Sequence, residues 1–187
     1  MHWVELNEEN WGKGIQEILR VIQPPRHLRS KPMDLSEEAV SEMIREQDFF
    51  DNYKNFDGHG LLHPYEGVVR QGQKLVTDHT TGLTWQRLGS DDEMVFEKAE
   101  KYIQSLNDQN FGGYNDWRLP TLEEAMSLLE PKKNNDGLYI DPVFDEIQSW
   151  LLTTDKRDAS SAWVVDFLTG YCNHGDVTND YYVRGVR

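Results

Sequence analysis

Cys172 and His174 form the one pair of neighbouring side chains in this sequence that suggests a nucleophile. They lie two residues apart, so a β-strand would present both on one face, where imidazole could activate the thiolate. Such dyads are normally assembled from distant parts of a chain with a third orienting group, and no second cysteine is present. We therefore interpret Cys172 as a small packed residue and predict that the protein is not an enzyme.

His59 and His63 have the four-residue spacing that binds zinc when it falls on a helix. Here Gly58, Gly60 and Pro64 oppose helix formation, because two are flexible and one is a helix breaker. We expect two surface histidines and no cofactor.

Two segments carry enough side-chain oxygen to suggest a Ca²⁺ site. Neither follows the EF-hand spacing, and Asn and Asp favour turns without any metal. We predict solvated turns and keep Ca²⁺ as the alternative reading. The candidate ligands in the first segment are Asn134, Asp136 and Asp141, and those in the second are Asp176, Asn179 and Asp180.

The segment from Thr169 to Tyr182 lies between two β-prone runs and mixes aromatic with adaptable polar side chains. Recognition loops favour this composition. We therefore expect an exposed ligand-binding loop. Its candidate binding residues are Tyr171, Asn173, His174, Asp176, Asn179, Asp180 and Tyr182.

Four amphipathic helices are expected to position these segments. Apolar residues recur at helical spacing in each, and each has a capping residue in front. Thr121 and Glu124 have the spacing of a capping box. The expected helices cover residues 7–23, begin at Asp34 or Ser36, run from Asp91 or Asp92 to Leu106, and begin at Pro120.

Strands are expected mainly after the helices. A hairpin is predicted over 74–86, and further strands over 150–153, 162–167 and 181–186. This segregation indicates an α+β fold with a mainly antiparallel twisted sheet, flanking helices and long loops, preceded by an accessory helical segment. We divide the chain into an N-terminal strand, helix and Pro/Arg-rich linker (1–33), a helical lead-in with an irregular segment (34–73), and the main domain (74–187).

The motif DWRLP is interpreted as structural. Trp117 should fill the core, Arg118 should pair with a buried carboxylate, and Pro120 should fix the turn into the next helix. Trp85 and Trp163 stand within apolar strands, so we expect them to be packed as well.

The formal net charge of −14 and the isoelectric point near 4.7 disfavour nucleic acid and anionic membranes as partners. No apolar stretch is long enough to span a membrane, and no signal peptide is visible. A lone cysteine fits a reducing compartment, so a cytoplasmic location is expected. Self-association into a homo-oligomer stays open.

Several sequence blocks together resemble a known bacterial family. These are TDHTTGLTWQ, FGGYNDWRLPT, YIDPVFD, AWVVDF and YYVRGVR. Their order and spacing over residues 75–187 resemble the Lcl C-terminal-domain-like family, long filed as a domain of unknown function and named after part of a collagen-like adhesin. The resemblance implies a C-type-lectin-like fold and a binding role. Residues 2–22 are also similar to the last strand and helix of bacterial Toll/interleukin-receptor-type domains.

Three functions remain open at this point. The first is a non-catalytic ligand- or protein-binding module. The second is a structural domain of a larger signalling or defence protein, assembled through Trp11 and Ile15 of the N-terminal helix. The third is carbohydrate or glycosaminoglycan binding, as in the adhesin that names the family, although a sulfated polysaccharide would be repelled by this net charge.

Overall fold

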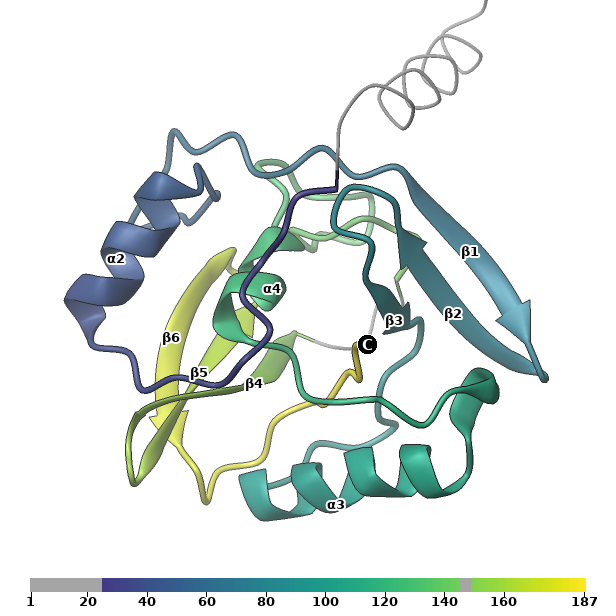
Figure 1. Cartoon of the computed structure of the whole chain (residues 1–187). Helices are drawn as coiled ribbons and strands as arrows, with labels where there is room; N and C mark the ends of the chain where they lie inside the picture. Colours follow the sequence, from purple (N-terminus) through teal and green to yellow (C-terminus); the bar gives the residue numbers. More distant parts are fainter. Residues whose placement is uncertain (1–24, 145–148) are drawn as a thin grey trace, which may run out of the picture.

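Two three-stranded antiparallel sheets frame the protein in the computed structural model, which describes residues 25–144 and 149–187. The first sheet has the order β1 (Tyr65–Arg70), β2 (Gln73–Asp78), β3 (Thr84–Gln86). The second has the order β4 (Trp150–Asp158), β5 (Ser161–Asp166), β6 (Tyr171–Asp176). Figure 1 shows the sheets on opposite sides of α4 (Leu122–Ser127). The α+β class and the hairpin over 74–86 are confirmed, but the expected single sheet is divided in two.

Strand β1 lies in a segment that the sequence predicted as helical and irregular. Four of its six residues are exposed, so it lacks the apolar alternation that marks a half-buried strand. The turn into β2 uses Gln71 and Gly72, both with positive φ angles of 49° and 77°. Two consecutive left-handed residues match the twist of a two-residue hairpin.

Local capping signals locate two of the helices correctly. Helix α2 (Glu37–Glu46) begins after Ser36, whose side chain accepts a hydrogen bond from the backbone N–H of Ala39. Helix α4 begins after Thr121, and Thr121 and Glu124 form the complete capping box. In both cases the side chain satisfies backbone N–H groups that have no partner within the helix.

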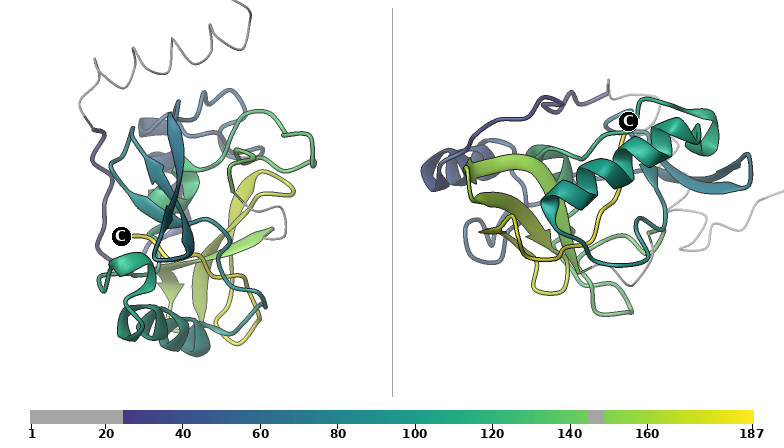
Figure 2. Two further views of the ribbon diagram at one scale, coloured as in Figure 1. Left: turned by 90° about the vertical axis from the view of Figure 1, so that its right-hand side faces the viewer. Right: turned by 90° about the horizontal axis from the view of Figure 1, so that it is seen from below.

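Helix α3 (Phe96–Asp108) begins later than predicted, after Val95 and without a side-chain cap. The reason is the backbone pairing of Met94, which precedes Val95. Met94 exchanges two backbone hydrogen bonds with Tyr181, of 2.8 and 3.0 Å, which hold the chain extended and prevent a start at Asp91 or Asp92. A short 3₁₀ turn, η1 (Phe111–Gly113), follows α3, which lies across the lower end of the molecule in Figure 1 and in the left view of Figure 2.

The C-terminal segment pairs with both sheets, but it is not the regular strand expected over 181–186. Tyr182 forms a bridge with Leu151 of β4, whereas Val186 bridges both Trp85 of β3 and Arg118. Because its partner changes every few residues, no continuous ladder develops. Figure 1 places the C-terminus between the two sheets.

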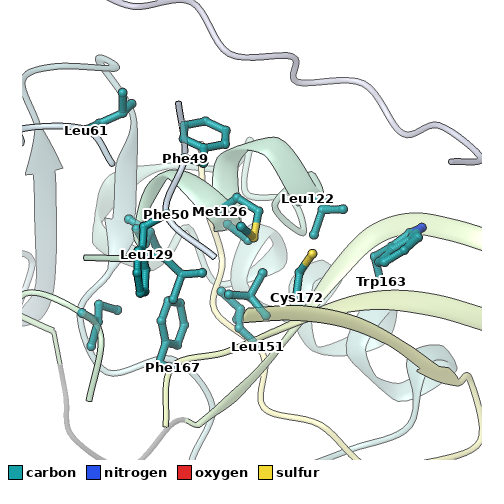
Figure 3. Packing of buried hydrophobic residues seen from close by; sticks show 14 of the residues in the cluster. Phe49, Phe50, Leu61, Leu122, Met126, Leu129, Leu151, Trp163, Phe167 and Cys172 are labelled. Carbon is teal, nitrogen blue, oxygen red and sulfur yellow. The ribbon is translucent and has the colours of Figure 1, made fainter. Parts of the chain in front are cut away.

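The largest core cluster joins parts of the chain on both sides of residue 74. Val40, Ile44 and Phe49, from α2 and the turn after it, pack in one cluster with Leu122 of α4 and Val165 of β5. Figure 3 shows this packing around α4. A second cluster lies between α3 and the other face of β4 and β5. The lead-in segment is therefore part of the folded body.

Residues 25–33 run extended along this body, as expected of a linker, but a buried ion pair holds them in place. The guanidinium of Arg29 contacts both carboxylate oxygens of Asp155, at 3.0 and 2.6 Å. The same carboxylate accepts the backbone N–H groups of Met33 and Leu122, at 2.8 and 2.7 Å. The helix expected over 7–23, and with it Trp11 and Ile15, lies outside the described residues.

Candidate functional site

The expected recognition loop over 169–182 is largely a strand. Residues Tyr171–Asp176 form β6, which pairs with β5 at the edge of its sheet. Asn173 and Gly175 are turn-forming types, but hydrogen bonding to the fully buried β5 overrides their local preference. The prediction of a loop was therefore wrong for these six residues, and turns remain only on either side of β6.

The seven candidate binding residues do not converge on one surface. Alternation along β6 places Tyr171 and Asn173 on one face and His174 on the other, beside Trp163. Asn173 is exposed and His174 is half-buried. Tyr182 is half-buried next to β4. Asp176 at the end of β6 is exposed, as are Asn179 and Asp180 in the turn after it.

Cys172 and His174 share a face, as predicted, but they form no nucleophilic pair. Cys172 is completely buried, and burial raises the pKa of its thiol far above the ordinary value. Its neighbours in Figure 3 are core side chains. His174 contacts Glu37 instead, with 3.0 Å between its Nε2 and Oε1 of the carboxylate. The arrangement offers no thiolate for catalysis.

The oxygen atoms considered for Ca²⁺ already serve as hydrogen-bond acceptors in turns. Oδ1 of Asn134 accepts the backbone N–H groups of Asp136 and Leu138, at 2.9 and 3.0 Å. Oδ1 of Asp141 accepts that of Val143 at 2.7 Å. Residues 25–144 and 149–187 contain no group of three or more His, Cys, Asp or Glu placed to hold a metal ion.

The second oxygen-rich segment is also a turn. Oδ1 of Asp176 accepts hydrogen bonds from the hydroxyl and the backbone N–H of Thr178, at 2.6 and 2.8 Å. These two bonds lower the pKa of the Asp176 carboxyl, because they stabilise its charged form.

His59 and His63 are separated by their environments. The side chain of His59 is 86% exposed and pairs with Asp48. His63 is buried, which the surface prediction missed: its Nδ1 lies 2.9 Å from Oδ2 of Asp78 and its Nε2 lies 2.8 Å from the carbonyl oxygen of Ser127. Both ring nitrogens face acceptors, an arrangement that favours the protonated, charged ring.

A series of aromatic rings surrounds Tyr171, the one predicted residue that joins a larger exposed cluster. Trp150 packs edge-to-face on Tyr171, with 6.0 Å between the ring centroids, and Tyr53 does the same at 4.9 Å. Tyr53 is 76% exposed. Sequence reasoning missed Tyr53 and Trp150, although an aromatic residue within the turn-forming run DNYKNFDG was a signal.

Two turns that are joined to each other carry further exposed apolar side chains. The backbone N–H of Asn52 donates to the carbonyl of Gly170 at 2.8 Å, which ties the turn after α2 to the turn between β5 and β6. These turns carry Phe56, 71% exposed, and Leu168, 50% exposed. We use the term aromatic surface for Tyr53, Trp150 and Tyr171, together with Phe56 and Leu168 on these two turns.

Asp51 makes the aromatic surface rigid. Its buried carboxylate accepts the backbone N–H groups of Tyr53 and Lys54 through Oδ1, at 2.9 and 2.8 Å, and that of Cys172 through Oδ2, at 2.9 Å. Lys54 in turn donates to the carbonyl of Cys172 at 2.6 Å and lies over the ring of Tyr171. The turn is thus fixed to the outer edge of β6 by three side-chain-mediated links.

The structural reading of the DWRLP motif is confirmed. Trp117 is buried and donates from its indole nitrogen to the carbonyl of Phe111 at 3.0 Å. Arg118 forms a bidentate pair with Glu124, with both distances 2.6 Å and the carboxylate almost fully buried. Trp85 and Trp163 are completely buried, as expected.

The fold and these contacts define an α+β protein with a preformed aromatic surface at one sheet edge. Among the described residues, no helix is long and apolar enough to cross a bilayer. The chain belongs to the Lcl C-terminal domain family, whose model matches residues 74–187. No curated protein and no solved structure matches it.

Proposed function

We propose that this protein is a non-catalytic binding module with a C-type-lectin-like fold, and that its aromatic surface contacts a partner protein. The observation that carries the proposal is the exposure of Tyr53, whose ring packs edge-to-face on Tyr171, which Trp150 also contacts; Phe56 is exposed on the same turn as Tyr53. Tyr, Trp and Arg are enriched among the few residues that carry most of the binding energy at protein interfaces. The family resemblance supports the fold.

Rigidity strengthens the case for recognition. A surface already held in one conformation loses little entropy on binding, which leaves more of the contact energy for affinity. The three backbone N–H groups held by Asp51 supply this preorganisation. Large exposed apolar side chains are unfavourably hydrated in the free protein. Covering them with an apolar patch of a partner is therefore favourable.

A protein partner fits better than the sulfated polysaccharide bound by a related adhesin. The net charge of −14 repels polyanions. Lys54, beside the aromatic surface, already donates a hydrogen bond to a backbone carbonyl and lies over the face of Tyr171. A polyanion would therefore find little uncommitted positive charge here, whereas an apolar protein patch would be complementary.

The test is affinity capture with the full chain and two variants. The double variant Tyr53→Ala, Phe56→Ala removes the two most exposed rings, and its stability should change little because exposed positions tolerate truncation. Val69→Ala is the matched control, since Val69 is 70% exposed on β1, in the other sheet. We expect one protein to be captured by the native chain and the control but lost with the double variant.

Two results would refute the proposal. One is capture of the same proteins in equal amounts by all three chains when their melting temperatures agree. The other is that a purified glycan binds in a manner that depends on Tyr53 and Phe56, while no captured protein depends on these two residues.

A further inference from the structure

Strand β1 is the outer strand of the first sheet, whose order is β1-β2-β3. Figure 1 shows it on the outside of the molecule, with β2 between it and β3. An exposed strand edge offers unpaired backbone N–H and C=O groups to another strand. At β6, the edge of the second sheet, Asp51 and Lys54 occupy the backbone N–H and carbonyl of Cys172. Within residues 25–144 and 149–187, nothing does this at Gly67 or Val69 of β1.

The register of the hairpin shows which backbone groups of β1 point outward. The carbonyl of Lys74 in β2 accepts a hydrogen bond from the backbone N–H of Arg87 at 3.1 Å, so Lys74 turns its backbone polar groups away from β1. Its partner Val69 therefore belongs to a non-hydrogen-bonded pair, and so does Gly67 two residues earlier. The N–H and C=O groups of Gly67 and Val69 thus point away from β2.

A second copy of β1 can pair with this edge in the antiparallel direction. With the two-fold axis at Val68, Gly67 of each copy lies opposite Val69 of the other, and each of these pairs exchanges two backbone hydrogen bonds. The same register places Glu66 of each copy opposite Arg70 of the other. The edge is therefore complementary to itself in both hydrogen bonding and charge.

The charges distinguish this register from its neighbour. Opposite charges directly across an antiparallel pair stabilise it. A register centred on Gly67 would place Arg70 opposite Pro64 and Glu66 opposite Val68, where no ion pair can form. We therefore expect the axis at Val68.

The charged side chains at this edge are accessible. The guanidinium of Arg70 lies over the ring of Tyr114, 4.7 Å from its centroid, and has no acidic partner among the described residues. The Glu66 side chain contacts His79 and is 53% exposed. Arg70 and the exposed Lys74 give the edge positive charge. The net charge of −14 is therefore not concentrated here, and more distant charges are screened at physiological salt.

Val69 gains an apolar contact in this pairing. Its side chain is 70% exposed in the single chain. It lies on the same face as Gly67 of the second copy, which has no Cβ and leaves room for it. Val143 packs over Gly67, since a Cβ added to that glycine would lie 3.9 Å from it. Val69 can therefore pack against Val143 of the second copy.

We propose that two copies of this chain pair through β1 into a symmetric dimer, which joins their first sheets into one continuous antiparallel sheet. The aromatic surface belongs to the second sheet and stays uncovered. Each dimer then carries two aromatic surfaces, so a partner with repeated sites binds more tightly than to one chain. Only this last consequence rests on the proposed function.

The first test is sedimentation velocity of the full chain from about 10 μM to about 1 mM, a range that covers a weak dimer. We expect the mass to rise with concentration from 21.8 kDa towards twice that value. Val69→Pro removes an outward N–H that β2 does not use, so the chain should fold and lose the dimer. Val69→Thr keeps the N–H and the branched shape, and it should dimerise as the native chain does.

A charge exchange tests the ion pairs. Arg70→Glu sets like charges opposite each other at two symmetry-related places and should weaken the dimer roughly tenfold. The double variant Glu66→Arg, Arg70→Glu restores opposite charges and should recover it. Lys98→Glu makes the same charge change at an exposed position of α3 and should have no effect.

A cysteine at the axis tests the register. In the dimer Val68 faces its own copy in a non-hydrogen-bonded pair, with Cα atoms about 4.5 Å apart, which suits a disulfide. Val68→Cys should therefore form a cross-linked dimer under mild oxidation, and faster than Gln73→Cys at the exposed end of the hairpin. Cys172 is buried and should not compete.

A chain that stays monomeric up to about 1 mM, with no faster cross-linking of Val68→Cys than of Gln73→Cys, would overturn the proposal. So would a dimer that persists in both Val69→Pro and Arg70→Glu, because another surface would then form it. If Val69→Pro failed to fold, the charge exchange would still decide. The double variant Tyr53→Ala, Phe56→Ala should dimerise normally, so this proposal and the proposed function can fail separately.

Discussion

Single buried carboxylates hold together the irregular parts of this protein. Asp51 fixes a surface turn to β6, and Asp155 fixes the extended segment 25–33 to the start of α4. Each accepts several backbone N–H groups that would otherwise be buried without a partner, at a cost of about 1–3 kcal/mol each. Positions remote in the sequence are therefore joined through a few oxygen atoms.

The buried pair of His63 and Asp78 leads to a prediction about pH. Burial opposes the charge on both groups, but their contact outweighs it, raising the pKa of His63 and lowering that of Asp78. A raised histidine pKa stabilises the fold below the unfolded value of about 6.5, and this contribution is lost as the pH rises through the folded pKa. Unfolding by urea should therefore show a lower free energy at about pH 9 than at about pH 6.

His63→Gln provides the decisive comparison. It leaves Asp78 buried without its counter-charge, so the free energy of unfolding should fall by about 3 kcal/mol or more. His59→Gln, at the exposed pair with Asp48, should cost at most about 1 kcal/mol. The interpretation is wrong if the His63 variant keeps the same difference between the two pH values as the native chain, since Glu130 and the remaining acids would then cause it.

Among single residues, the pairing of Arg118 with a buried carboxylate was predicted; the structure shows that the carboxylate is Glu124, which belongs to the capping box. The contact between Tyr53 and Tyr171 could not. Nothing local indicates that Asp51 captures the edge of β6, and only that contact brings the two rings together. The candidate site was thus predicted in one residue, Tyr171, and missed in the others.

Elements that carry their own start signals were predictable, whereas those that depend on a distant partner were not. Ser36 and Thr121 begin helices through bonds within one turn. The start of α3 instead depends on the pairing of Met94 with Tyr181, and β6 exists because β5 offers a buried edge. Turn-forming residues in β6 suggested a loop. Their local preference is weaker than the pairing with β5, so the segment forms a strand.

Deleting residues 181–187 should unfold the protein, because this segment forms bridges with Trp85 of β3, with Leu151 of β4 and with Arg118. Circular dichroism should show loss of the cooperative thermal transition. Asp180→Ala, an exposed change just before the segment, should alter stability by no more than about 0.5 kcal/mol. A truncated chain whose melting temperature stayed within a few degrees of native would contradict this role.

For the whole molecule, the family match and the folded body have different limits. The match begins at residue 74, inside β2, where Lys74 pairs with Val69 of β1. The core cluster also includes Val40, Ile44 and Phe49 from before that point. The segment before residue 74 therefore supplies part of the interior that the matched region would otherwise expose.

The last prediction follows from this shared interior. A fragment of residues 74–187 should not unfold cooperatively, because it lacks β1 and the apolar side chains that cover α4, whereas residues 25–187 should melt in a single transition. Within the full chain, Phe49→Ala should lower the free energy of unfolding by about 3–5 kcal/mol while keeping one transition, since Phe49 is completely buried. The measurement is urea unfolding followed by both tryptophan fluorescence and circular dichroism. A fragment 74–187 that unfolds cooperatively with native-like stability, or a Phe49 variant with two separate transitions, would show that the two parts fold independently.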